Sequence, residues 1–425
     1  MAVPSWLTKR TQGPIARQTL RTSAVLGLRL VIQAGTLLLV ARFLGPALFG
    51  SFAGMASLAV ILGSLSTLGT HLVLLAEMSH DPSQAQATLA YAAPVTLTTA
   101  TTLLICFLLI AMLGFGHQNI SFVELLCIGI TEIVLQPALA LPCMAELARG
   151  RTARSQLLST LPLALRMLGA FAIAELDMTD PLSLYVGVCL FASSLALALS
   201  RNLLDWPSVG QWRSPKKDEL AHTAGFAAIN LTGSSPAELD KTLAATLLPH
   251  SLAGLYAAGG RIVGASTLPI IALVLSSLPR LFRESRDQSS SGNLLTWVFS
   301  VALSYSLLLA FALWLAAPLL QRLFGSEYLG LEEVVRWLTL AIPGMSLRVA
   351  AGNVLLSLNK PWHRVGFEAI GIGTLAFSAW VLSAKSLVWG MPVALACSEW
   401  AMALAGLIFI FCGRSPTHPA LSAAE

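Results

Sequence analysis

The stretch SAVLGLRLVIQAGTLLLVARFLGPALFGSFAGMASLAV, residues 23–60, contains two apolar runs separated by Gly45-Pro46. A membrane-spanning helix needs about 20 mainly apolar residues, because each residue rises about 1.5 Å through a hydrocarbon core about 30 Å thick. Adjacent glycine and proline residues interrupt helices. The stretch therefore predicts two spanning helices joined by a tight turn.

The same pattern continues along the whole chain. Of the 425 residues, 56% are apolar and only 11% are charged, and the mean hydropathy is +0.75, which is more apolar than one water-soluble core requires. We expect an all-α polytopic membrane protein of about twelve spans, and no connection is long enough to form a separate domain. The predicted spans are residues 17–42, 47–76, 87–113, 119–147, 152–176, 180–204, 217–247, 250–283, 293–322, 331–358, 362–384 and 387–412.

Basic residues fix the predicted orientation, since Lys and Arg near span ends stay in the cytoplasm. With the N-terminus inside, 16 of the 26 basic residues fall in cytoplasmic segments, three on the opposite side and seven within spans. Both termini are therefore expected to be cytoplasmic. The net charge of +5 reflects this topology, so it predicts no nucleic-acid partner.

The longest cytoplasmic connection divides the spans into two groups of six. We predict an N-terminal lobe at 1–204, a linker at 205–217 and a C-terminal lobe at 218–425. A short internal repeat supports this division, since Leu48–Ala53 (LFGSFA) at the start of the second span resembles Leu252–Ala257 (LAGLYA) at the start of the eighth. Two six-helix lobes that run in the same direction imply a pseudo-two-fold axis along the membrane normal.

Many polar residues lie within the predicted spans. An ionisable group at mid-bilayer costs about 2.5 to 3.5 kcal/mol on insertion scales, so each needs a partner, a wet cavity or a function. On the first span, Arg29, Gln33 and Thr36 share one helix face. The seventh span carries a stripe of Asn230, Ser234, Glu238 and Lys241, with Asp240 projecting elsewhere. Other spans contain Glu124, Glu132, Gln136, Arg166, Arg261, Arg348, Asn353, Glu368 and Glu399.

Two interpretations of these groups stay open. They are internal ion pairs that fix helix packing, or they line a hydrated path. Similar depth on neighbouring helices favours pairing of Glu132 with Arg166, of Glu238 with Arg261, and of Arg348 with Glu368. The polar face of the first span and the stripe of the seventh favour a cavity, because the first span has no local carboxylate.

The chain lacks the usual catalytic patterns. It contains no P-loop, HExxH or GxSxG sequence, and its seven histidines form no metal-ligand spacing. The six cysteines lie in apolar stretches without a CxxC pair and are interpreted as small hydrophobic residues. We therefore expect neither an enzyme nor a bound cofactor or metal. Gly50xxxGly54 and Gly260xxxGly264 favour close helix packing.

Two motifs resemble a known family. Residues 42–50 (RFLGPALFG) are similar to the "aR-x-LGp-x-x-fG" segment of bacterial polysaccharide flippases of the O-antigen, Wzx-like type. Asp240-Lys241, then Gly254-Leu255-Tyr256-Ala257-Ala258 and Arg261, resemble the family's "DK... G-x-Ya-a-x-r" stretch. Those proteins belong to the multidrug/oligosaccharidyl-lipid/polysaccharide exporter (MOP) superfamily, and the resemblance in span number and orientation covers the whole chain.

The resemblance implies a two-lobed bundle in the bacterial inner membrane that alternates between inward-open and outward-open states. Its substrate would be an undecaprenyl-pyrophosphate-linked oligosaccharide, flipped to the periplasmic leaflet for surface polysaccharide synthesis, with the lipid tail in the membrane. A polysaccharide polymerase and chain-length proteins are the implied partners. Substrate-binding residues would be Arg29, Gln33, Asn230, Lys241, Arg261 and Arg348. The coupling ion would be held by Glu132, Asp240 or Glu399.

Two alternatives to the flippase stay open. A multidrug or cation antiporter of the same superfamily should favour carboxylates in its cavity, and the six acidic residues in the spans are compatible with it. A membrane glycosyltransferase, polymerase or ligase would use the same lipid carrier. Such enzymes usually present a sizeable extracytoplasmic loop, which this chain lacks.

Overall fold

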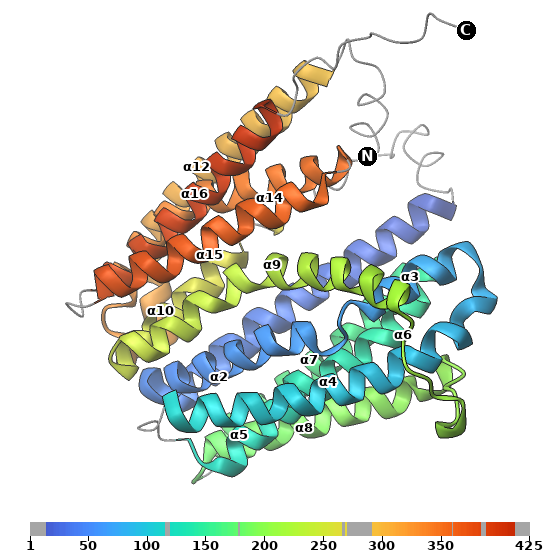
Figure 1. Cartoon of the computed structure of the whole chain (residues 1–425). Coiled ribbons are helices and arrows are strands. Elements are labelled where there is room, and N and C mark those ends of the chain that lie inside the picture. Colours follow the sequence, from blue (N-terminus) through green and yellow to red (C-terminus); the bar gives the residue numbers. More distant parts are fainter. Residues whose placement is uncertain are drawn as a thin grey trace, which may run out of the picture. The chain divides into compact units, whose positions relative to one another are not determined.

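The computed structural model describes residues 14–114, 120–176, 179–265, 268–269, 291–358, 360–383 and 388–412, and the regular structure of these residues is entirely helical (Figure 1). The α-helices are α2 (Pro14–Ser66), α3 (Thr70–His80), α4 (Ala85–Gly114), α5 (Phe122–Gly129), α6 (Gln136–Ala148), α7 (Thr152–Leu176), α8 (Pro181–Ser200), α9 (Lys217–Leu247), α10 (His250–Ala265), α12 (Ser291–Phe324), α13 (Leu331–Leu338), α14 (Ile342–Ser357), α15 (Pro361–Ser383) and α16 (Gly390–Cys412). Short turns are η1 (Pro82–Gln84), η2 (Ile130–Leu135), η3 (Arg201–Leu203), η4 (Val209–Gln211), η5 (Ser326–Tyr328) and η6 (Thr339–Ala341).

The predicted class, an all-α polytopic membrane protein, is confirmed. Within the described ranges, nine helices are long and apolar enough to cross a membrane. The first of them, Ala24–Ser66, has 43 residues, about twice what one crossing needs. It is broken at Gly45, whose φ of 67° and ψ of 168° are not helical, and the chain reverses direction there (Figure 1). The predicted break at Gly45-Pro46 is therefore confirmed.

The helix bounds follow most of the predicted spans. The spans predicted at 152–176 and 217–247 coincide with α7 and α9. Neither α9 nor α10 is among the nine, because the polar residues of α9 lower its hydropathy and α10 is only 16 residues long. The end predicted for the eighth span, at residue 283, lies outside the described residues.

The span predicted at 47–76 is wrong as one continuous helix. The second arm of α2 ends at Ser66 and α3 begins at Thr70. Between them, Leu68 and Gly69 have φ of 45° and 78°, in the left-handed region that glycine tolerates and leucine rarely adopts. Hydropathy alone missed this interruption because residues 47–76 contain no Asp, Glu, Lys or Arg and are mostly apolar.

The fourth predicted span is one rod built from three segments, an α-helix, a π-helix and a second α-helix. Ser121 and Glu124 form a reciprocal capping box at the start of α5. The rod then widens into the π-helix η2, where the Gln136 N–H donates to the Thr131 carbonyl, and continues as α6. Pro137 supplies no N–H to the helical ladder, which accounts for a shift of register at this point. Single π turns inside α-helices occur often at functional sites.

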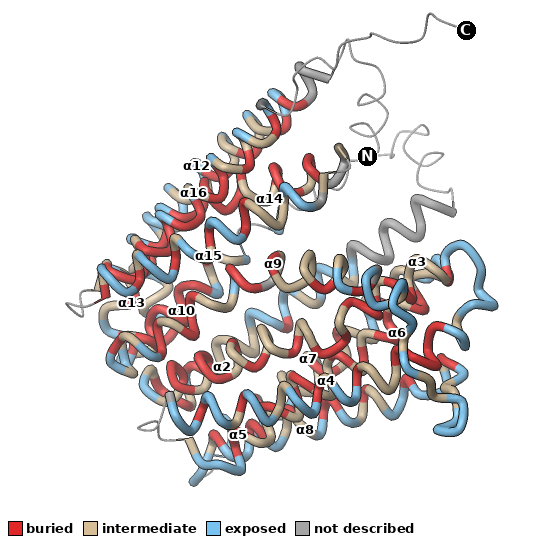
Figure 2. Tube along the Cα trace, in the orientation of Figure 1, coloured by how far each residue is buried: buried red, intermediate tan, exposed pale blue. Residues whose placement is uncertain are grey.

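The chain forms two compact units. Unit 1 comprises residues 1–258 and 319–331, and unit 2 comprises residues 259–318 and 332–425. In unit 1, α3, α4 and α6 share a core, and in unit 2, α12, α14, α15 and α16 share another. Large apolar side chains are exposed elsewhere, such as Leu113 (85% exposed) and Phe377 (68%), as expected of a surface facing lipid (Figure 2). The lobe boundaries at 204 and 218 stay a prediction.

Glycines determine how closely the helices of unit 1 pack. A methyl group at Gly54 would collide with Ala245 of α9, and one at Gly50 would strike the backbone of Gly254 in α10. The packing predicted for the first small-residue motif is therefore confirmed. Among the described residues, no atom lies within 4 Å of a methyl group built at Gly260 or Gly264, so close packing at the second motif stays a prediction.

Candidate functional site

A polar cavity of about 210 Å³ lies within unit 1. It is lined by Val60, Gly63, Ser64, Thr67, His71, Glu132, Gln136, Pro137, Ala140 and Asn230. These residues come from the end of α2, the start of α3, the π turn with α6, and α9. Two of the predicted site residues, Glu132 and Asn230, therefore line one cavity.

The interruption between α2 and α3 supplies part of the cavity wall. The Thr67 hydroxyl oxygen lies 2.7 Å from Nδ1 of His71, and both side chains are buried. On the facing helix, Asn230 donates from Nδ2 to the Ser64 carbonyl over 2.7 Å. The left-handed turn thus places hydroxyl, imidazole and amide groups at the cavity.

The π turn supplies the charged part. Arg166 of α7 forms an ion pair with Glu132 over 2.9 Å and also donates to the Ser193 hydroxyl over 3.1 Å. The predicted pairing of Glu132 with Arg166 is confirmed. Gly63 lets α2 approach this turn, because a side chain there would collide with the Glu132 carbonyl. The carboxylate is mostly buried but stays in contact with the cavity.

A second polar network joins α2, α9 and α10 within unit 1. Tyr256 donates to the buried Asp240 carboxylate over 2.9 Å, and Lys241 approaches the same carboxylate to 3.1 Å. Lys241 also lies 3.7 Å from Glu238, which accepts a hydrogen bond from Ser57 over 2.7 Å. Lys241, predicted to bind the lipid head group, and Asp240, predicted to hold the coupling ion, therefore form an ion pair with each other. The pairing of Glu238 with Arg261 joins the two units and stays a prediction.

The polar face of the first span is less enclosed. Arg29 is half-buried and donates to the Ser159 hydroxyl over 3.4 Å, while Gln33 is exposed. The Thr36 hydroxyl bonds its own helix at Ile32. In the part of the chain that the structure describes, Arg29 has no carboxylate within 4 Å.

Unit 2 contains two further ion pairs, and one differs from the prediction. Arg348 bonds Glu399 over 2.6 Å, with Glu399 fully buried and Arg348 12% exposed. Glu368 pairs instead with Arg364, one turn earlier on the same helix, over 3.0 Å. The pairing of Arg348 with Glu368 is therefore wrong, because α14 packs along α16 and Glu368 has a cation on its own helix. Arg261 is exposed and forms no ion pair within the described ranges.

Several polar residues were missed by the sequence analysis. Thr67 and His71 are uncharged groups in an apolar stretch, and Tyr256 was noted only as part of a motif. Glu146 is fully buried at the end of α6 and faces three arginines at 2.9, 3.7 and 3.4 Å. The sequence ELARGRTAR, in which one acid precedes Arg149, Arg151 and Arg154, carries that signal.

Comparison with known proteins shows which solved structures the chain resembles. No protein-family model and no curated protein sequence matches the chain. Among solved structures, the chain is similar to an inward-facing multidrug resistance MATE family transporter of the MOP superfamily, with a TM-score of 0.71, 11% identity, and coverage of 93% of this chain and 98% of the other. The chain shares the fold of this solved structure. The MOP fold also includes the lipid II flippase MurJ, in an inward closed conformation, which matches with a TM-score of 0.68 and 11% identity over 92% of this chain and 87% of MurJ.

A third match shows how the MOP fold varies at its binding pocket. A MOP superfamily transporter from Pyrococcus furiosus, whose pocket has reverse polarity that suggests a different function, matches with a TM-score of 0.58 and 12% identity over 93% of each chain. Within one fold, pocket polarity therefore differs between proteins, so function has to be argued from the residues themselves. In the described ranges, no group of three or more His, Cys, Asp and Glu residues could hold a metal ion.

Proposed function

We propose that this protein flips an undecaprenyl-pyrophosphate-linked oligosaccharide from the cytoplasmic to the periplasmic leaflet of the bacterial inner membrane. The two lobes predicted from the sequence would alternate between inward-open and outward-open states. Support comes from the MOP fold, which MurJ shares, and from the two flippase-like motifs. A polymerase that consumes the flipped unit in the periplasm is the partner that this proposal implies.

One observation carries the proposal. Of the five basic residues predicted to lie deep in the membrane, Arg166, Lys241 and Arg348 are neutralised by carboxylates. Arg29 and Arg261 have no carboxylate within 4 Å among the described residues. A guanidinium left unpaired at membrane depth is costly, and a diphosphate is the anion that such donors bind well. These two arginines are therefore the head-group ligands of the proposal, and its sugar ligands are Gln33 and Asn230, whose amide also bonds the Ser64 carbonyl.

The paired carboxylates are proposed to couple ion binding to a conformational change. Glu132, Asp240 and Glu399 each bond a basic side chain, so protonation of the acid or binding of a cation would release that partner. Ion binding would then be coupled to a change in helix packing. Lys241 and Arg348 would reach the substrate only in a state in which these pairs open.

A second candidate is a multidrug or cation antiporter, and one observation favours it. Glu132 and His71 both line the 210 Å³ cavity. A cavity lined by a carboxylate and a hydrogen-bonding side chain suits a cationic drug. The solved structures with this fold include several MATE transporters. The antiporter and the flippase predict opposite chemistry at Arg29, because an arginine next to the path repels a cation and attracts a diphosphate.

Deletion of the gene distinguishes the two candidates. The flippase predicts loss of surface glycan and accumulation of lipid-linked repeat units on the cytoplasmic leaflet, detected by lipid extraction and glycan staining. Unchanged surface glycan with increased drug sensitivity would refute the flippase and favour the antiporter.

Complementation then tests the head-group residues. Arg29→Ala and Arg261→Ala should each reduce surface glycan about tenfold or more, since a charge-assisted hydrogen bond contributes about 1.5 to 3 kcal/mol. Lys217→Ala is the matched control, because it removes one positive charge at the exposed start of α9. Normal glycan in both arginine variants, at equal protein amounts in the membrane, would refute the assignment.

A further inference from the structure

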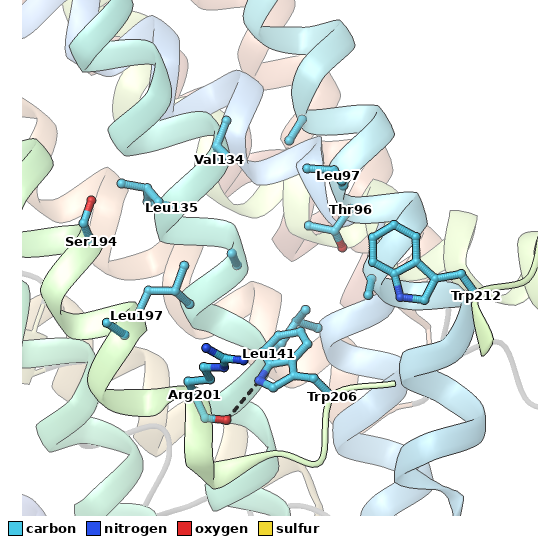
Figure 3. Close-up of a pocket in the computed structure, with 14 residues that line it drawn as sticks. Thr96, Leu97, Val134, Leu135, Leu141, Ser194, Leu197, Arg201, Trp206 and Trp212 are labelled. Atoms are coloured by element: carbon cyan, nitrogen blue, oxygen red, sulfur yellow. Dashed lines mark hydrogen bonds between the residues drawn. The ribbon is translucent and has the colours of Figure 1, made fainter. Parts of the chain in front are cut away.

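A second and larger cavity, of about 510 Å³, lies in unit 1 (Figure 3). Its walls come from α4, from the π turn with α6, from α8, and from the connection that follows α8. The lining residues are Ala93, Thr96, Leu97, Ala100, Val134, Leu135, Ala138, Leu141, Ser194, Leu197, Ala198, Arg201, Trp206 and Trp212. Most are apolar, and we call this cavity the α4–α8 groove.

Two polar atoms in the α4–α8 groove have no partner. The Thr96 hydroxyl and the Trp212 indole N–H are buried and form no hydrogen bond within the described part of the chain. Thr96 is only 5% exposed, so water reaches it poorly. A buried donor without an acceptor costs about 1 to 3 kcal/mol, so both atoms indicate a ligand that brings acceptor oxygens.

Polar groups gather toward one end of the groove. Trp206 donates from Nε1 to the Arg201 carbonyl over 3.1 Å, which fixes the connection against the end of α8 (Figure 3). Arg201 is exposed and has no ion pair within the described ranges. Indoles and arginines at span ends occupy the membrane–water interface, and the apolar walls around Val134 and Ala100 then lie deeper. The groove therefore matches one leaflet of a bilayer, with its charged group at the membrane–water interface and its apolar walls at the depth of the acyl chains.

We propose that the α4–α8 groove binds a glycerophospholipid of the leaflet on the Arg201 side, which the basic residues predict to be cytoplasmic. An acyl chain would occupy the apolar part, the ester carbonyls would accept from Trp212 and Thr96, and the phosphate would accept from Arg201. One guanidinium matches the single charge of a phosphodiester better than a diphosphate. A neighbouring protein helix fits poorly, since its own backbone bonds leave no free acceptor mid-helix.

Photolabelling tests the proposal on the full-length protein in phosphatidylcholine nanodiscs. The probe is phosphatidylglycerol with a diazirine in one acyl chain, and mass spectrometry maps the labelled peptides. We expect labels on α4, η2 and α8. Ala198→Trp fills the groove from an exposed position and should abolish this labelling, whereas Leu199→Trp, one residue further on the same helix and outside the groove lining, should not.

Donor variants test the head-group contacts. Thr96→Val keeps the shape and Trp212→Phe keeps an aromatic ring without the N–H, and each should weaken labelling about fivefold, with Arg201→Gln weakening it about tenfold. Trp380→Phe, exposed in unit 2, is the control for loss of an aromatic N–H. Labelling is compared only among variants whose elution volume in size-exclusion chromatography equals that of the unmodified protein, since an equal volume reports an intact fold.

Two results would overturn the proposal. One is equal labelling of the groove in the Ala198→Trp and Leu199→Trp proteins. The other is labelling by a diazirine-bearing undecaprenyl phosphate and not by phosphatidylglycerol, which would assign the groove to the tail of a polyprenyl carrier. Neither result depends on transport, so the outcome is separate from that of the proposed flipping.

Discussion

Replacement of Glu132 by glutamine removes one charge from an ion pair at the centre of unit 1. The Arg166 guanidinium lies 2.9 Å from the carboxylate, with both side chains mostly buried. Breaking a buried pair from one side costs about 3 to 5 kcal/mol, because the remaining charge stays desolvated. Glu132→Gln should cost about 3 kcal/mol, the low end, since the glutamine oxygen and Ser193 still accept from the arginine.

Replacement of the partner, Arg166→Gln, should lower the free energy of unfolding by less. Arg166→Gln leaves a carboxylate that still touches the 210 Å³ cavity, where water or a proton can reach it. We expect a loss of about 2 kcal/mol, the value of a hydrogen bond to a charged group. In the double variant neither charge is left alone, so its loss should fall at least about 1.5 kcal/mol below the sum of the two single losses.

Equilibrium unfolding in detergent micelles, followed by circular dichroism, measures these free energies. The control cycle combines Glu132→Gln with Arg364→Gln in unit 2, which shares no partner with the first pair. Additivity of the Glu132 and Arg166 changes within about 0.5 kcal/mol would refute the reasoning. The two side chains would then be close without stabilising each other.

Three further predictions concern packing and polar contacts. Gly63→Ala should destabilise unit 1 by about 1 to 3 kcal/mol through a collision with the backbone of η2, whereas Gly187→Ala, inside α8 with no atom within 4 Å, should stabilise it by up to about 1 kcal/mol in the same thermal unfolding assay. Tyr256→Phe should cost about 1 to 3 kcal/mol in chemical unfolding, because the buried aspartate loses its hydroxyl donor. The Ser83 N–H and hydroxyl lower the pKa of Asp81, so their stabilisation is present above the ordinary aspartate pKa and is lost as pH falls through the lowered value. Ser83→Ala should raise that pKa in an NMR titration.

Much of the fold could be predicted from the sequence, because a spanning helix must be long and apolar. The Gly45-Pro46 break is also marked by residue type, since a φ of 67° suits glycine. The interruption at Leu68 and Gly69 could not be predicted in the same way. Leucine rarely adopts left-handed geometry, so its residue type gives no sign of the turn, and the stretch remains apolar enough for a continuous span.

Ion pairs of the candidate site could be predicted from the sequence where equal depth in the membrane is enough to determine the partner. Glu132 and Arg166 lie on consecutive spans, so equal depth is enough to bring them together. The partner of Arg348 depends on which helices pack, and α14 runs along α16. Sequence order favours the next helix, α15, and this is the physical reason for the wrong pairing. The spacing of Arg364 and Glu368, four residues apart, does predict a pair on one helix.

The internal repeat gives the network around Asp240 a particular meaning. In the predicted repeat Gly50 corresponds to Gly254, and the two pack backbone to backbone, as expected of equivalent residues near an axis that relates two copies. At this place the copies differ in chemistry. Phe52 packs edge-on against an aromatic ring, whereas its counterpart Tyr256 donates to a buried carboxylate. A single added hydroxyl thus supports a buried charge in one copy, so any coupling by that charge belongs to one half of the repeat.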